Sequence, residues 1–156
     1  MTRRTRDNLT LGPAADAGRE AAALLRSKAP TPHIRRALAE APAGAVQKYR
    51  GQNDSTLLHT ASDERRADVV AFLLEDPDAA VDARDARRFT PLHLAAGVGA
   101  TDVARLLLEH GAEPGALDDE GRAPLHLACM LPAGRGPGRR RLLRDCACFA
   151  RLVKRA

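Results

Sequence analysis

The chain has 156 residues, of which 44% are hydrophobic, yet aromatic residues make up only 3% and tryptophan is absent. A core built from Leu, Val and Ala favours closely packed helices and argues against an all-β fold. The net charge of +5 is unevenly spread: residues 29–130 hold 11 basic and 16 acidic side chains, whereas residues 131–156 hold 8 basic and 1 acidic. An acidic body with basic ends argues against a folded part that binds nucleic acid.

The N-terminal residues 1–17 contain no apolar run of the length that a signal peptide needs. No stretch of the chain approaches the 18 apolar residues typical of a membrane-spanning helix. We therefore expect a disordered tail over 1–17 and a soluble protein of the cytoplasm or nucleus, without a membrane span. The three cysteines form no disulfide framework, because they are odd in number and crowded near the C-terminus: Cys129, Cys146 and Cys148.

Residues 18–53 predict a short pair of helices. The segment from Ile34 to Glu40 has the same pattern as one that begins 35 positions later at Val69, and residues 20–26 are its predicted partner. This unit lacks the motif of the segments that follow it. We interpret it as a degenerate repeat that caps the N-terminal end of an array.

A seven-residue motif then occurs three times, as Thr-Leu-Leu-His-Thr-Ala-Ser, Thr-Pro-Leu-His-Leu-Ala-Ala and Ala-Pro-Leu-His-Leu-Ala-Cys. Its histidine recurs after 34 and then 33 positions. A period of this length is the signature of a repeat architecture. The residues to which we assign a structural role in the motif are Thr56, His59, Thr90, Pro91, Leu92, His93, Pro124, Leu125 and His126.

A second motif shares this period. The segment that begins at Asp68 recurs 34 positions later at Asp102. Two motifs with one period predict helix pairs over 54–87, 88–120 and 121–156. Each pair is too small to bury its own apolar face, so the pairs must stack to be stable.

The middle repeat shows why each unit contains two helices. Thr90 suits the N-cap of a helix, and Pro91 suits its first position, where a missing N–H costs nothing. Gly97 and Gly99 are expected to supply the left-handed conformation that ends this helix. Asp102 is expected to cap the next one.

The last repeat departs from the period. The outer-helix motif returns at Phe149, which is 46 positions after Val103 instead of 33. The difference indicates an insertion at 131–141, rich in Gly, Pro and Arg, which lacks the spacing of a phosphate-binding loop. Its arginines are either solvated side chains or a basic patch for nuclear localisation, nucleic acid or anionic lipid: Arg135, Arg139, Arg140 and Arg141.

The period and the Thr-Pro-Leu-His-Leu-Ala-Ala motif resemble the ankyrin repeat, closely over 81–114 and well over 43–130. This resemblance implies an all-α solenoid of stacked helix-turn-helix units with β-hairpin-like loops, comprising about three repeats and the capping repeat. It also implies a scaffold or adaptor, not an enzyme, that binds another protein without a cofactor and is monomeric. Arg65 occupies a position at which the family usually has glycine.

When the family's binding positions are carried over to this sequence, the binding surface falls at the hairpin tips and on the concave face of the inner helices. Charge is uneven across this surface, because Arg87 and Arg88 stand beside Asp118, Asp119 and Glu120, which favours a partner of matching charge pattern. The expected partner-binding residues are Asn53, Asp54, Asp63, Glu64, Arg65, Arg87, Arg88, Gly97, Val98, Asp119, Glu120 and Met130.

Two other classes of function stay open. The basic C-terminal segment would bind nucleic acid or an anionic membrane with a steep dependence on salt. Cys146 and Cys148, with Cys129 and His126, have zinc-ligand chemistry but lack paired Cys-x-x-Cys spacing. The three motif histidines are expected about 10 Å apart in stacked repeats, too far to share one zinc ion. In the family, this histidine ties the loop to the helix by hydrogen bonds.

Overall fold

A computed structural model describes residues 13–41 and 49–130. Within these ranges the secondary structure is helical, with no strand, which confirms the predicted all-α fold. A short 3-10 helix, η1 (Gln52–Asp54), precedes the first full repeat. The α-helices are α1 (Pro13–Arg26), α2 (Thr31–Ala39), α4 (Leu57–Asp63), α5 (Ala67–Leu74), α6 (Pro91–Val98), α7 (Thr101–Glu109) and α8 (Pro124–Met130).

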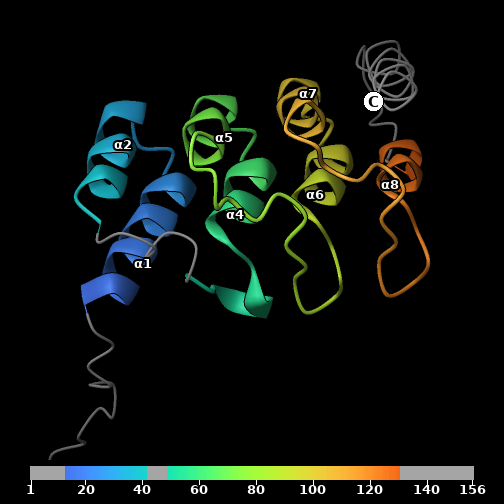
Figure 1. Ribbon diagram of the computed structural model, residues 1–156, viewed down its shortest axis with the longest axis horizontal. Helices are drawn as coiled ribbons and strands as arrows, with labels where there is room; N and C mark the ends of the chain where they lie inside the picture. The colour runs from blue at the N-terminus through green and yellow to red at the C-terminus, as the bar shows by residue number, and fades with distance from the viewer. Residues whose placement is uncertain (1–12, 42–48, 131–156) are drawn as a thin grey trace, which may run out of the picture.

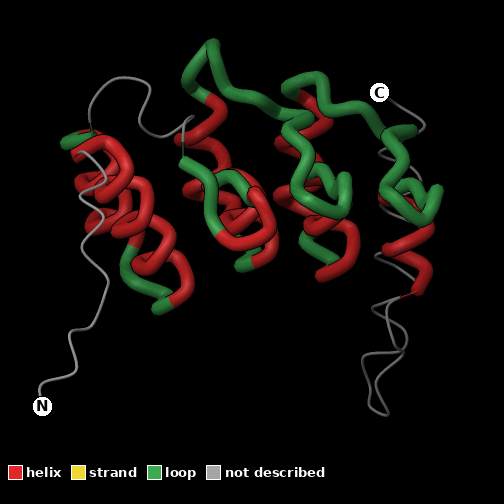
Figure 2. Tube along the Cα trace, turned by 90° about the horizontal axis from the view of Figure 1, so that it is seen from below, coloured by secondary structure: helices red, strands yellow, loops and turns green. Residues whose placement is uncertain are grey.

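The helices form two rows, as the predicted solenoid requires (Figure 1). In the inner row α1 contacts α4, α4 contacts α6, and α6 contacts α8. In the outer row α2 contacts α5, and α5 contacts α7. Within each pair, the inner helix also contacts the outer helix that follows it. The long loops between repeats lie along one edge of the array (Figure 2).

The helix boundaries follow local chemistry. Thr90 is extended at the N-cap of α6, Pro91 is the first helical residue, and Gly99 ends the helix with a left-handed φ of 70°. Gly97 lies inside α6, so the expectation that it helps to end the helix is wrong. Asp102 is the second residue of α7, which starts at Thr101 after Ala100. The expectation that Asp102 is the N-cap is therefore also wrong, and its carboxylate stands in the first turn, where negative charge favours a helix.

The N-terminal helix begins earlier than predicted. Because α1 starts at Pro13, the prediction of disorder over 1–17 is wrong for residues 13–17. Proline suits the first position of a helix, and the alanines that follow it are the best helix formers. The rest of the predicted tail, and the predicted insertion at 131–141 with the segment after it, lie outside the described residues.

A continuous apolar core runs between the two rows. It is built from aliphatic side chains and alanine, as the scarcity of aromatic residues predicts. Burial of each large aliphatic side chain stabilises the fold by about 1.5–3 kcal/mol. The large apolar side chains that are fully buried include Leu25, Ile34, Leu57, Val69, Leu92 and Leu107.

Candidate protein interface

His59 joins its own repeat to the next one. Its Nδ1 lies 3.2 Å from the backbone nitrogen of Thr56 and 2.8 Å from the hydroxyl of that residue. A backbone N–H only donates, so Nδ1 must accept and the ring proton must be on Nε2. This Nε2–H donates to the carbonyl of Phe89, 2.9 Å away and 30 positions later. The ring therefore holds its helix cap and the next loop together.

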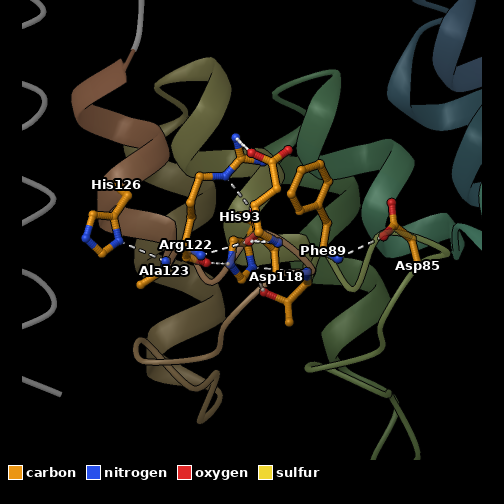
Figure 3. Close-up of polar contacts among 9 residues, drawn as sticks. Asp85, Phe89, His93, Asp118, Arg122, Ala123 and His126 are labelled. Carbon is orange, nitrogen blue, oxygen red and sulfur yellow. Dashed lines mark hydrogen bonds and ion pairs between the residues drawn. The ribbon is translucent and has the colours of Figure 1, made fainter.

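His93 repeats this arrangement one unit further on. Its Nδ1 accepts from the backbone N–H of Thr90 at 3.1 Å, and its Nε2 donates to the carbonyl of Arg122 at 3.0 Å (Figure 3). In the next unit, Nδ1 of His126 accepts from the backbone N–H of Ala123 at 2.9 Å. Each histidine thus accepts from the helix cap of its own repeat, and the three rings do not share a partner. Across residues 13–41 and 49–130, no group of three or more His, Cys, Asp or Glu is placed to hold a metal ion.

Burial favours the neutral form of both bridging histidines. Desolvation lowers the pKa of His59 below its ordinary value, although the hydrogen bond to the Phe89 carbonyl partly offsets this effect. Desolvation likewise lowers the pKa of His93, against the hydrogen bond to the Arg122 carbonyl. Both side chains are fully buried. A neutral ring is also what the hydrogen bonds need, because a protonated Nδ1 would face an N–H donor.

Asp118 organises the hairpin-like loop before α8. Its side chain is almost fully buried, at 2% exposure. Oδ1 accepts from the backbone N–H groups of Glu120 at 2.9 Å and Arg122 at 2.8 Å, and Oδ2 accepts from Nε of Arg122 at 2.8 Å. Burial alone would raise the pKa of Asp118, but these bonds and the charge of Arg122 together lower it.

Asp85 has the same role in the preceding loop. Its Oδ1 accepts from the backbone N–H groups of Arg87 at 2.9 Å and Phe89 at 2.8 Å. The two sequence motifs that define the repeat include neither Asp85 nor Asp118. Their 33-residue separation was the signal that they share a structural role, because it equals the repeat period.

Backbone hydrogen bonds connect the hairpin tips of neighbouring repeats. The N–H of Ala86 donates to the carbonyl of Asn53 at 2.8 Å, and the N–H of Asp119 donates to the carbonyl of Arg87 at 3.2 Å. The tips therefore form one row along the edge seen in Figure 2. The motif gave no sign of these bonds, because any residue except proline can form them.

All predicted partner-binding residues of the tips are exposed, but they differ in their contacts. Nη1 of Arg122 lies 2.7 Å from Oε2 of Glu120, so this carboxylate is already paired. The guanidinium of Arg87 lies over the ring of Phe89, with Cζ 4.7 Å from the ring centroid. The exposed set comprises Asn53, Asp54, Arg87, Arg88, Asp119 and Glu120.

The other predicted partner-binding residues lie at the C-terminal ends of α4, α6 and α8. The hairpin tips adjoin the N-terminal ends of the same helices. Because each of these helices has seven or eight residues, the tip residues and the residues at the C-terminal ends lie about 11 Å apart along the helix axis. Met130 is 63% exposed, and a Cβ added to Gly97 would meet no atom within 4 Å. Asp63 and Arg65 are exposed, while Glu64 and Val98 are half-buried. The predicted basic patch, Arg135 with Arg139, Arg140 and Arg141, lies outside the described residues.

Comparison with known families gives two adjoining matches. A family model described as "Ankyrin repeats (many copies)" matches residues 76–128, and one described as "Ankyrin repeat" matches residues 53–86. Together they cover the units that contain α4 to α8. The part of the chain with the strongest motif agreement is thus the part that the family models match.

Several curated proteins contain similar segments. Rabankyrin-5 of Mus musculus is 36% identical over 100 residues, which cover 56% of this chain and 8% of that protein. Tyrosine-protein kinase HTK16 of Hydra vulgaris is 36% identical over 77 residues, 48% of this chain and 10% of that protein. Palmitoyltransferase ZDHHC13 of Homo sapiens is 34% identical over 86 residues, 55% of this chain and 14% of that protein.

These matches span a small part of each relative, at most 14% of its length. The activities named for the kinase and the palmitoyltransferase therefore describe those proteins and not this chain. Among the helices in the described part, none has the length and apolar character needed to cross a bilayer.

Proposed function

This chain is an ankyrin-repeat protein, and we propose that it is a scaffold or adaptor that holds a partner protein against its hairpin tips and inner helices. Ankyrin repeats are generally protein-interaction modules and are typically not enzymatic. The proposal is therefore that binding, without a cofactor, is the activity of the protein.

The observation that carries the proposal is the pair of backbone hydrogen bonds between tips. They join Ala86 to Asn53 and Asp119 to Arg87. Loops fixed in this way lose little conformational entropy when a partner binds. Exposed charged side chains on such a frame suit the recognition of a protein surface by matching charge.

A pull-down with the intact chain tests this proposal. The test variant replaces four tip residues by alanine, namely Arg87, Arg88, Asp119 and Glu120, and circular dichroism verifies that it stays folded. A matched control replaces Arg105 and Glu109, which are exposed on α7. We expect the tip variant to lose a partner that the wild type and the control both recover. Equal recovery of every partner by all three proteins would contradict the proposal.

The basic C-terminal segment supplies the alternative function. A variant with Arg135, Arg139, Arg140 and Arg141 replaced by glutamine should still recover the partner if the tips are responsible. Loss of binding in this variant, with a steep salt dependence in the wild type, would instead favour binding of nucleic acid or an anionic membrane.

A further inference from the structure

In the hairpin tips of the first and third repeats one carboxylate is paired with an arginine, whereas the tip of the second repeat has no ion pair within the described residues. In the first repeat, Oδ1 of Asp54 lies 3.5 Å from Nε of Arg50, and in the third, Glu120 is paired with Arg122. In the second, Arg87 and Arg88 are exposed, and neither guanidinium forms an ion pair or hydrogen bond within the described residues. The middle tip therefore presents two unpaired positive charges.

The aspartate of their own loop, Asp85, forms no ion pair with these arginines. Oδ1 of Asp85 is occupied by the backbone N–H groups of Arg87 and Phe89, and no ion pair joins Asp85 to a guanidinium in the described part. A third guanidinium adds to the positive charge, because Nη1 of Arg84 donates to the carbonyl of Leu117 at 3.1 Å without a carboxylate partner. Asp119 is exposed on the neighbouring tip and lacks an ion pair within the described residues.

Arg88 also occupies an unfavourable backbone conformation. Its φ is 61°, and the residue one period later, Gly121, has a φ of 74°. Glycine adopts this left-handed region freely, whereas a side chain with a Cβ is disfavoured there. Arg65 is in the same region at φ 58°, but its Nη2 donates to the carbonyl of Gly99 at 3.3 Å. Asp54, one period earlier, has a φ of 58°, so the turn itself requires this conformation. The side chain of Arg88 has no such contact within the described residues, and a side chain kept at a strained position without a bond in the fold is a candidate for a functional role.

We propose that Arg87 and Arg88 anchor an acidic segment of the partner protein, with its carboxylates against the two guanidinium groups. This inference rests on the proposed function and specifies the chemistry of the partner. Arginine suits the role, because its planar donors match a carboxylate in a bidentate manner. Stacking on Phe89 holds the guanidinium of Arg87 in place before binding.

The test uses a short synthetic peptide of alternating Glu and Gly as the probe. It is titrated into the full-length, ¹⁵N-labelled chain in which Arg135, Arg139, Arg140 and Arg141 are replaced by glutamine, so that this basic segment does not compete. We expect the earliest amide shifts at residues 86–89. Arg87→Gln and Arg88→Gly should each weaken binding by up to about five-fold, the upper limit for an exposed ion pair.

Three comparisons separate an anchor from a structural role. Arg88→Gly removes backbone strain, so it should raise the melting temperature while it weakens peptide binding. Arg105→Gln removes an exposed charge from α7 and should leave peptide affinity unchanged. A lysine-glycine peptide should cause no shifts at residues 86–89.

Peptide shifts that avoid residues 86–89, or that persist unchanged in Arg88→Gly, would overturn the inference. Tighter binding of an oligothymidylate than of the peptide at these residues would also overturn it, in favour of nucleic acid. If the four-residue tip variant loses its partner but Arg87→Gln with Arg88→Gly retains it, the acidic anchor is wrong and the proposed function stands. If no partner depends on the tips, both are wrong.

Discussion

A histidine that bridges two repeats must be neutral to make its bonds. Nδ1 of His59 and of His93 accepts from a backbone N–H, and Nε2 of each donates to a carbonyl of the next loop. Protonation would set a donor against a donor at Nδ1. Burial of the rings opposes the charge as well, which lowers the pKa of both.

The stability of the protein should therefore fall in mild acid. Each folded-state pKa is below the ordinary histidine value of 6.5, so the unfolded chain binds more protons as pH decreases. The contribution of the two histidines to the free energy of unfolding is complete above pH 6.5. It is lost as the pH falls through the folded-state pKa values of the two rings. Thermal melts across this range should show a falling melting temperature, and the loss should be smaller in a His59→Gln, His93→Gln variant. An equal pH dependence in both proteins would contradict this explanation.

Arg65 offers a second prediction at this scale. It has a left-handed φ of 58° where the equivalent residue is Gly99, so Arg65→Gly should increase the free energy of unfolding by about 1 kcal/mol. Arg105→Gly makes the same change inside the right-handed helix α7 and should decrease that free energy by about 1 kcal/mol. Urea unfolding measures both. The explanation fails if the two substitutions shift the midpoint in the same direction.

The repeat period predicted some residue roles well and others poorly. It identified His59, His93 and His126 as equivalent, because a motif that recurs at one period occupies one environment. It did not reveal that Asp118 is buried, because burial of a loop carboxylate depends on bonds to Arg122 that the motif does not encode. The tip charges were predicted to be unevenly distributed, and only the structure shows which of them are paired.

At the scale of the elements, one arginine holds the first helix pair against the repeat that follows. Nη1 of Arg66 donates to the carbonyl of Ala29 at 2.9 Å, and its Nη2 donates to the hydroxyl of Thr31 at 3.1 Å. The same Nη2 lies 3.1 Å from Oδ2 of Asp68. The hydrogen bonds from Arg66 lower the pKa of Asp68 to about 2, with a further contribution from the Thr31 hydroxyl.

Arg66→Ala should therefore loosen the connection between the first two helix pairs. It removes donors from a partly buried network, so we expect a loss of about 1–3 kcal/mol. Arg36→Ala is the control, because the exposed ion pair of Arg36 with Glu40, at 2.8 Å, stays at the C-terminal end of α2 and is worth little. Hydrogen exchange of α2 should accelerate in Arg66→Ala and hardly change in Arg36→Ala. Equal acceleration in both would show that Arg66 is not the connection.

Element boundaries were predictable where a cap and a breaker flank a helix, as Thr90 and Gly99 flank α6. They were less predictable where neither signal is present. The start of α1 was missed because its first residues carry no repeat motif. The N-cap of α7 was placed two residues too late, at Asp102 instead of Ala100, because Thr101 and Asp102 both suit the start of a helix.

At the scale of the whole molecule, stacking determines what the protein presents to a partner. The inner and outer rows bury one shared core, and the bridging histidines fix the loops at Phe89 and Arg122 to the helix pairs that precede them. The loop aspartates hold the turns within those loops. Hydrogen bonds between neighbouring tips then turn separate loops into one surface. The period alone predicted this architecture, because units that cannot bury their own core must stack. The sequence did not identify a partner, since the pattern of stacking is independent of what binds to it.

The most direct test of the central claim is a nuclear Overhauser spectrum of the full-length labelled chain. If the repeats stack in register, the amide proton of Ala86 should show cross-peaks to residue 53, and that of Asp119 to residue 87. His59 and His93 should likewise show ring-proton contacts to the loops at Phe89 and Arg122, respectively. Absence of these contacts between repeats, or contacts of the two histidine rings with each other, would contradict the account.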